Sequence, residues 1–342
     1  MRFAVISLTL NGTHIADKIS VALNEKHYAE HYTFYKYPFE GAVEFSDLSQ
    51  LIKEIFYMID GIIFVSAVGI AVRAISGFVR SKLTDPAIVA IDEFGRFAVS
   101  VLSGHLGGAN ELTRFVADVT DACAVVTTAT DTGKKFSPDS FAAANFLHIC
   151  SMDMSKRIAA SVLNDVKIGI DSDYPYKNKH FDTDNNSDYG ICISDDISKK
   201  PFKYTLNLLP KKISVGIGCK KSVDSEIFEN FILKMLASES IGLEKIRCIS
   251  TIDIKRNETA VIRFCRKYAI PLNFYSSQQL INVKGKFSES EFVKMVTGVD
   301  NVCERSAVVG GGRLIVKKHS ENGVTFAAAE NDVDIDFERR IF

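Results

Sequence analysis

The sequence of 342 residues has little net charge and no long apolar run. Because 41 Lys and Arg face 42 Asp and Glu, the net charge of -1 gives no overall reason to expect nucleic acid or an acidic membrane surface as a partner. The apolar run at residues 61–72 stops at Arg73, short of the ~20 residues that a membrane-spanning helix needs. Any anionic ligand must therefore be held by local groups.

Paired cysteines are also missing. The seven cysteines are odd in number and none forms a C-x-x-C pair, which indicates reduced thiols in the cytoplasm rather than disulfides or a zinc site. The segment from His27 to His31 matches H-x-x-E-H, a pattern of one class of zinc peptidases. No helical apolar pattern surrounds it, and residues 32–37 look like a strand. We interpret these histidines as solvated loop residues and expect no metal site.

The length and the pattern of apolar residues predict several α/β units. A single core usually stops growing at ~250–300 residues, so two or three domains are expected. Predicted strands at 3–10, 32–37 and 62–66 alternate with helices at 11–23, 48–58 and 69–80, and a hairpin joins 87–92 to 97–102, which favours a mainly parallel sheet. We predict an N-terminal α/β domain at 1–150, a middle segment at 151–210, a C-terminal α/β domain at 211–330 and a tail at 331–342.

The segment LSGHLGGAN (102–110) is the clearest candidate site. It follows a strand and leads into a helix at 109–121, for which Asn110 is the expected N-cap. Glycines let the backbone approach a ligand, and free amides of a first helical turn favour an anion. A strand at 124–128 then brings small hydroxyls and a carboxylate to a carboxyl-end edge, where α/β sheets bind ligands. The candidate ligand residues are Ser103, Gly104, Gly107, Gly108, Asn110, Thr128, Thr130 and Asp131, with Arg73 from the preceding helix.

The helix that begins at Ser137 is expected to reach about residue 150, and the polar stretch at 171–200 is expected to be a flexible loop or linker. The second α/β unit contains GIGCKK (216–221), read as a glycine loop followed by a helix capped by Ser222. Lys220 and Lys221 beside backbone amides predict an anion site. The loop lacks both the third glycine of a dinucleotide fingerprint and the G-K-[ST] of a P-loop, which disfavours nucleotide binding.

Three N-terminal motifs resemble one known family. LSGHLGGAN, TTATD (127–131) and DPAIVAIDEFG (85–95) are similar to the N-terminal region of the CbiG family of anaerobic cobalamin biosynthesis. In the C-terminal region the resemblance rests on GIGCKK, on Lys255 with Glu258, and on residues 302–304 with Gly312, Leu314 and Lys317. It spans residues 65–329 and is weakest in the middle. Cys123-Ala124 and Ser306 depart from it, at positions where the family more often has proline.

The resemblance implies a hydrolase that acts on a carbon–carbon bond: it opens the ring A δ-lactone of a cobalt-tetrapyrrole and releases acetaldehyde. Cobalt would come with the substrate, so no cofactor of the protein itself is expected. The many substrate carboxylates would be bound by cations and backbone amides, and neighbouring cobalamin-pathway enzymes are further candidate partners. The substrate-binding residues expected in the C-terminal region are Gly218, Lys220, Lys221, Lys255 and Glu258.

For catalysis we consider His105 as general base, with the amides of Gly107, Gly108 and Ala109 holding the oxyanion. Glu304 is the rival base. Two other functions stay open: a non-catalytic protein that binds or transfers a corrinoid intermediate, and a binder of phosphate or nucleotide.

Overall fold

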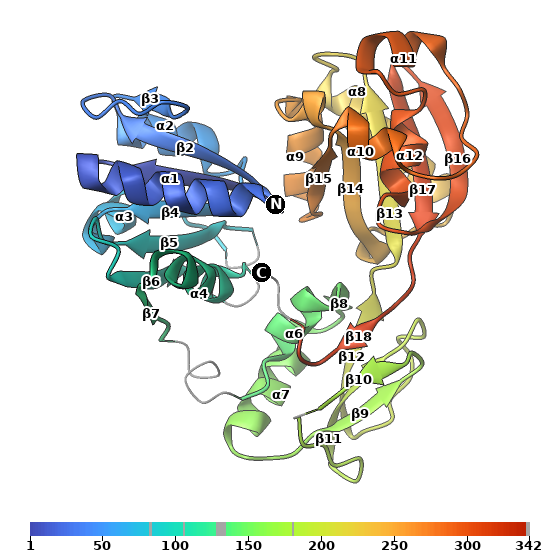
Figure 1. Cartoon of the computed structure of the whole chain (residues 1–342). Helices are drawn as coiled ribbons and strands as arrows, with labels where there is room; N and C mark the ends of the chain where they lie inside the picture. Colours follow the sequence, from blue (N-terminus) through green and yellow to red (C-terminus); the bar gives the residue numbers. More distant parts are fainter. Residues whose placement is uncertain (82–83, 105–106, 128–134, 180, 340–342) are drawn as a thin grey trace. The chain divides into compact units, whose positions relative to one another are not determined.

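The computed structural model describes residues 1–342 except 82–83, 105–106, 128–134, 180 and 340–342. The chain forms two compact units. Unit 1 consists of Met1–Ala144, Ser155–Lys167 and Glu338–Phe342, and unit 2 of Asn145–Met154 and Ile168–Phe337. Strands and helices alternate in both, mostly with parallel strand pairs, which confirms the predicted α/β class (Figure 1). No helix in the described ranges is both long and apolar enough to cross a membrane.

Unit 1 is organised around a seven-stranded sheet of order β3-β2-β1-β4-β5-β6-β7. Its strands are β1 (Arg2–Ser7), β2 (Tyr28–Phe34), β3 (Val43–Phe45), β4 (Gly61–Val65), β5 (Ala87–Ile91), β6 (Phe97–Leu102) and β7 (Cys123–Val125). Strands β1 to β5 pair in parallel, β6 returns antiparallel to β5 as the predicted hairpin, and β7 is parallel to β6. The helices are α1 (Leu10–Asn24), α2 (Leu48–Ile55), α3 (Val68–Ile75), α4 (Ala109–Thr120), α6 (Pro138–Ala144) and α7 (Met152–Leu163).

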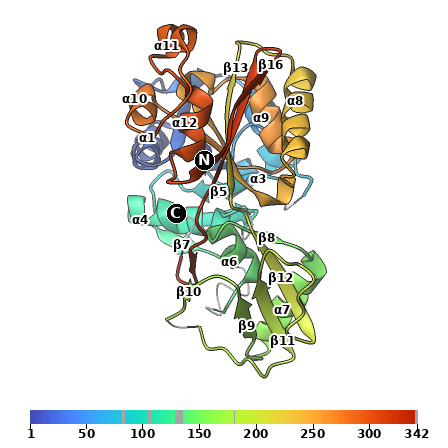
Figure 2. The ribbon, with the colours of Figure 1, turned by 90° about the vertical axis from the view of Figure 1, so that its right-hand side faces the viewer.

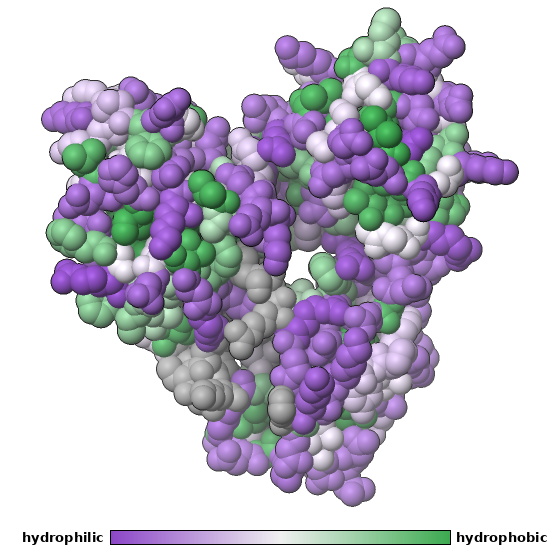
Figure 3. Space-filling model, viewed as in Figure 1, coloured by the Kyte–Doolittle hydropathy of each residue, from purple (hydrophilic) through white to green (hydrophobic). Residues whose placement is uncertain are grey.

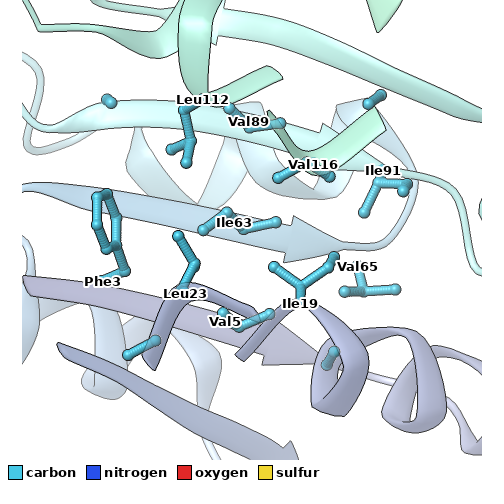
Figure 4. Close-up of a cluster of buried hydrophobic side chains, with 14 of the residues drawn as sticks. Phe3, Val5, Ile19, Leu23, Ile63, Val65, Val89, Ile91, Leu112 and Val116 are labelled. Carbon is cyan, nitrogen blue, oxygen red and sulfur yellow. The ribbon is translucent and has the colours of Figure 1, made fainter. Parts of the chain in front are cut away.

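Helices cover both faces of this sheet. Successive side chains of a strand point to opposite faces, so β1, β4 and β5, which are buried along nearly their whole length, supply two cores. On one face Val5, Ile63 and Val89 pack with Ile19 and Leu23 of α1 and with Leu112 and Val116 of α4 (Figure 4). On the other face Ile6, Phe64 and Ile88 pack with α2 and α3.

Unit 2 contains a five-stranded sheet of order β15-β14-β13-β17-β16, in which α8 and α9 cover one face and α10 and α12 the other (Figure 2). Its strands are β13 (Ile213–Cys219), β14 (Ile246–Ile252), β15 (Leu272–Tyr275), β16 (Arg313–Glu321) and β17 (Val324–Glu330). Its helices are α8 (Ser225–Ser238), η1 (Leu243–Lys245), η2 (Asp253–Lys255), α9 (Thr259–Lys267), α10 (Ser277–Ile281), α11 (Glu291–Thr297) and α12 (Val302–Val308). A four-stranded sheet contains β8 (Leu147–Ile149), β12 (Tyr204–Pro210), β11 (Tyr189–Ile193) and β9 (Gly169–Ser172), and β10 (Tyr176–Lys177) pairs with β18 (Ile335–Asp336).

The expectation of a flexible linker at 171–200 is wrong. This stretch contains β10 and β11, and β11 lies between β9 and β12 in the four-stranded sheet. Side chains also tie the segment together, since Ser194 Oγ donates to Asp173 Oδ2 at 2.6 Å and Asn185 Oδ1 accepts from the Ile170 amide at 2.9 Å. Hydrophilic side chains prevail on the visible face around β10 (Figure 3). Polar residues therefore dominate the mean hydropathy of residues 171–200, and the short buried strand β11 cannot be recognised from it.

Some helix and strand boundaries also differ from the prediction. The helix expected to reach residue 150 ends at Ala144, because Phe146 takes a left-handed φ of 54° and β8 follows. Helix α8 is capped by Asp224 rather than Ser222: the Asp224 carboxylate accepts from the amides of Glu226 and Ile227 at 2.9 and 3.0 Å. The strand expected at 32–37 is β2, which lies earlier, and α3 ends five residues before the predicted Arg80.

Candidate functional site

The glycine segment and the TTATD segment follow two neighbouring parallel strands. β6 and β7 pair in the register Phe97↔Cys123 to Val99↔Val125, so their carboxyl ends lie at the same edge of the sheet. The strand predicted at 124–128 is β7, which ends at Val125. Because β6 is antiparallel to β5, the edge where β6 and β7 end is the edge at which β1, β4 and β5 begin. His105, Thr128, Thr130 and Asp131 lie outside the described residues.

The backbone after β6 folds back on itself. Ser103 is buried with φ 60°, and its carbonyl accepts from the Ala109 amide at 3.1 Å, while the Gly104 carbonyl accepts from the Asn110 amide at 3.0 Å. Ala109 therefore does not offer the free amide that we expected for an oxyanion. A Cβ on Gly107 would lie 2.4 Å from Ser103 Cβ, so this tight return requires glycine.

Asn110 is not the N-cap of α4. Gly108 takes that position with φ 80° and offers no side-chain cap. Asn110 lies inside the first turn, 2% exposed, and its Oδ1 accepts from Ser100 Oγ at 2.7 Å. It therefore joins the helix start to β6, and any contact of its side chain with a ligand remains a prediction.

Arg73 is not joined to the glycine segment by a hydrogen bond or ion pair within the described residues. It is exposed in the last turn of α3, a helix that begins after the carboxyl end of β4. After α3 the chain returns to the edge where β5 begins. There Asp85 Oδ2 accepts from the amides of Arg80 and Ser81 at 2.8 and 2.9 Å. Asp85 also accepts through its carbonyl from Ser103 Oγ at 3.0 Å. Sequence reasoning missed Asp85, although it begins the motif DPAIVAIDEFG.

In unit 2 the structure brings the predicted anion-binding residues together. The loop after β13 and the turn after β14 lie at the carboxyl ends of two paired parallel strands. Glu258, 8% exposed, accepts through Oε2 from the Ser222 amide at 3.1 Å and from Lys255 Nζ at 3.4 Å. Glu258 therefore fixes the loop and neutralises Lys255.

Lys220 and Lys221 are the accessible cations of this loop. The Lys220 amide donates to the Gly323 carbonyl at 2.8 Å, but both side chains are exposed and no ion pair engages either within the described part of the chain. Beside them, burial raises the pKa of the Cys219 thiol to about 11, so this cysteine stays protonated and uncharged. The local charge of the loop surface is positive, which favours a carboxylate or another anion.

The residues Gly216 to Gly218 form part of β13, which corrects the prediction of a glycine loop there. A Cβ on Gly216 would lie 1.8 Å from the Cys303 carbonyl oxygen, so this glycine allows α12 to pack closely on the strand. Gly218 accepts through its carbonyl from Thr325 Oγ1 at 3.3 Å, within the pairing with β17. These contacts explain why glycine occupies both positions, and no ligand is needed for that explanation.

Glu304, the rival base, is 1% exposed on α12. Its carboxylate accepts from the Ser288 amide at 2.8 Å, from Ser288 Oγ at 2.9 Å and from the Lys318 amide at 2.8 Å. This carboxylate joins the segment before α11 to β16. Its hydrogen bonds and burial favour a structural function over proton transfer to a substrate.

The histidines of the H-x-x-E-H match do not form a metal centre. His31 lies in β2, 6% exposed, with Nε2 3.1 Å from Ser7 Oγ, so the expectation of a solvated loop histidine is wrong for it. Glu30 accepts from the Tyr32 hydroxyl at 2.6 Å. Within the described ranges, no group of three or more His, Cys, Asp or Glu is arranged to hold a metal ion.

Comparison with known proteins finds relatives that align with nearly the whole chain. A cobalt-precorrin-5A hydrolase of Priestia megaterium is 29% identical over 359 residues, with 96% of this chain and 94% of that protein covered. The protein of the same name from Salmonella typhimurium strain LT2 is 26% identical over 340 residues, with coverages of 94% and 95%. A solved structure of a cobalamin biosynthesis protein G homolog from Sulfolobus solfataricus covers 96% of this chain and 97% of its own, at 25% identity and a TM-score of 0.45.

Two family models match separate regions. The model described as Cobalamin synthesis G N-terminal matches residues 50–131, and that described as Cobalamin synthesis G C-terminus matches residues 213–329. The first contains the glycine segment and the second contains both the Lys220–Lys221 loop and Glu304. Because these models together match more than half of the sequence and the relatives align over nearly all of it, the chain belongs to the CbiG family of cobalamin synthesis.

Proposed function

We propose that this protein is a cobalt-precorrin-5A hydrolase, which opens the ring A δ-lactone of a cobalt-tetrapyrrole and releases acetaldehyde. The observation that carries the proposal is the nearly full-length match to two proteins of that name. Both CbiG family models also match this chain. The runner-up is a corrinoid-binding protein without catalysis.

The chemistry needs water, a base and donors for the developing oxyanion. Water attacks the lactone carbonyl carbon, the bond from that carbon to the ring oxygen breaks, and a carboxylate and an alcohol result. The alcohol then loses its proton, and the bond between the alcohol carbon and the macrocycle breaks. The alcohol carbon becomes the carbonyl carbon of acetaldehyde, and the macrocycle carbon takes up a proton. Neither step transfers electrons to the protein. We therefore propose no resident cofactor, with cobalt belonging to the substrate.

Each unit offers a candidate substrate site, and each is proposed by itself. In unit 2, Lys220 and Lys221 would bind substrate carboxylates at the end of β13, where backbone and charge both favour an anion. Lys255 and Glu258 would support that loop. Unit 1 by itself offers another candidate site, the edge formed by β6, β7 and the start of β5, which carries Ser103, Gly104, Gly107 and Gly108. His105 stays a candidate base by its position in the sequence alone.

Acetaldehyde release tests the function directly. Purified protein given the lactone-containing cobalt-tetrapyrrole should release acetaldehyde in many-fold excess over protein, measured with a coupled dehydrogenase. Heat-denatured protein and the ring-opened product serve as controls. Release limited to one equivalent, or binding without release, would favour the non-catalytic carrier.

The lysine pair provides the second test. Replacing Lys220 and Lys221 together with alanine should weaken substrate binding about 2–30-fold, because exposed ion pairs contribute roughly 0.2–1 kcal/mol each. Added salt should weaken wild-type binding more than binding by the variant. A matched control removes the same charge elsewhere in unit 2: Lys203→Ala with Lys267→Ala, whose side chains pair with Asp188 and Glu229. Equal affinity of the two double variants would remove Lys220 and Lys221 from the site.

A further inference from the structure

Asp85 lies where three segments of unit 1 meet. It precedes β5, and the register Ile88↔Leu102 places the start of β5 beside the end of β6. Ser103 Oγ donates to the Asp85 carbonyl at 3.0 Å, and the Asp85 amide donates to the Ser81 carbonyl at 2.9 Å. Asp85 is therefore fixed at the edge where the LSGHLGGAN segment begins.

One oxygen of its carboxylate is occupied and the other is not. Oδ2 accepts from the amides of Arg80 and Ser81, at 2.8 and 2.9 Å. The residue is only 5% exposed, yet Oδ1 is buried and has no hydrogen-bond partner within the described part of the chain. Leaving such an acceptor unpaired costs about 1–3 kcal/mol, and more when it carries charge. A buried polar group of this kind calls for a bound water, an ion or a catalytic function.

Asp92, at the opposite end of β5, shows the ordinary arrangement. Its Oδ1 accepts from the Phe94 amide at 3.0 Å, and its Oδ2 accepts from the amides of Arg96 and Phe97 at 2.9 and 2.7 Å. Both oxygens are thus used, although this side chain is more exposed than Asp85. The unpaired oxygen of Asp85 is therefore not a general feature of carboxylates at the ends of this strand.

We propose that Asp85 Oδ1 binds the hydrolytic water and acts as its general base. The proposal rests on the hydrolase function proposed above. Its geometric basis is a carboxylate held by two amides through one oxygen, with the other oxygen unpaired at the edge where β6 and β7 end. Glu304, by contrast, uses both of its oxygens in hydrogen bonds within unit 2.

The proton balance of this step is simple. As the water oxygen bonds to the lactone carbonyl carbon, Asp85 Oδ1 takes one of its protons. When the bond from that carbon to the ring oxygen breaks, the same proton passes to the leaving alkoxide, and Asp85 returns to the carboxylate. Arg80 and Ser81 keep Oδ2 in place throughout, so that only Oδ1 changes partner.

Asp85→Asn tests this with little change in shape. The amide oxygen can still accept from Arg80 and Ser81, while its NH2 group replaces the proposed base. We expect kcat to fall about 10²–10⁴-fold, the usual contribution of a general base, with KM changed less than about threefold. The residual activity should also lose the acid limb of the kcat profile. Asp92→Asn, made at the other end of β5, should keep wild-type kcat.

The possible results separate two questions. Wild-type protein that opens no lactone overturns both the hydrolase function and the assignment of Asp85. Active wild type together with an Asp85→Asn variant of similar kcat overturns the assignment alone. If Asp85→Asn does not fold, as judged by circular dichroism, the wild-type acid limb decides: a carboxyl pKa hardly moves on warming, whereas an imidazole pKa falls, and a falling value overturns the proposal.

Discussion

His27 is a partly buried residue in an environment that opposes its positive charge. Burial, first of all, lowers its pKa from 6.5 to about 4, helped by nearby positive charge, while Asp60 acts in the opposite direction. An unfolded chain restores the ordinary value, so the unfolded state binds more protons between these two pH values. The contribution of neutral His27 to stability is therefore fully present above pH 6.5 and is lost as the pH falls toward 4.

We expect this loss to be measurable by urea unfolding at pH 7.5 and pH 5. Wild type should lose about 1–2 kcal/mol more unfolding free energy than His27→Gln between these conditions, after allowance for partial exposure. The comparison is needed because the pKa values of His31 and His148 are also lowered by burial. Parallel pH dependences of wild type and His27→Gln would show that His27 titrates normally in the folded protein.

The contact between α12 and β13 depends on the absence of one side chain. A Cβ on Gly216 would lie 1.8 Å from the Cys303 carbonyl oxygen and 2.7 Å from the Ala307 amide nitrogen, and both are backbone atoms. Gly216→Ala should therefore displace α12 and destabilise unit 2 by about 2–4 kcal/mol. Gly310→Ala is the matched control, because its Cβ would meet Asn331 Oδ1 at 3.5 Å, an ordinary contact. Similar midpoints of the two variants in chemical denaturation would mean that the helix adjusts without cost.

Across the molecule, alternating apolar segments predicted much of the secondary structure, because periodicity depends on neighbours in the sequence. The β5–β6 hairpin was predicted correctly. Its consequence, that LSGHLGGAN lies where β5 begins, was missed because it depends on strand direction within the sheet. Contacts between residues that are far apart in the sequence could not be predicted from periodicity either. Glu304 looked like a base until its bonds to Ser288 and Lys318 were known. Gly216 was assigned to a glycine loop until its contact with α12 was known.

The pairing of β13 with β17 also determines when unit 2 can fold during synthesis. β13 is the first strand of the five-stranded sheet to leave the ribosome, yet its antiparallel neighbour β17 follows only after α12 and β16. Until β17 emerges, one edge of the nascent β13 has no native partner. In unit 1, by contrast, β1, β2 and β4 pair with one another early in the chain. Closing such a long loop is slow and exposes apolar strands meanwhile. We therefore expect the nascent unit that contains the lysine loop to expose an unpaired strand edge for longer than the β1–β4 part of unit 1 does.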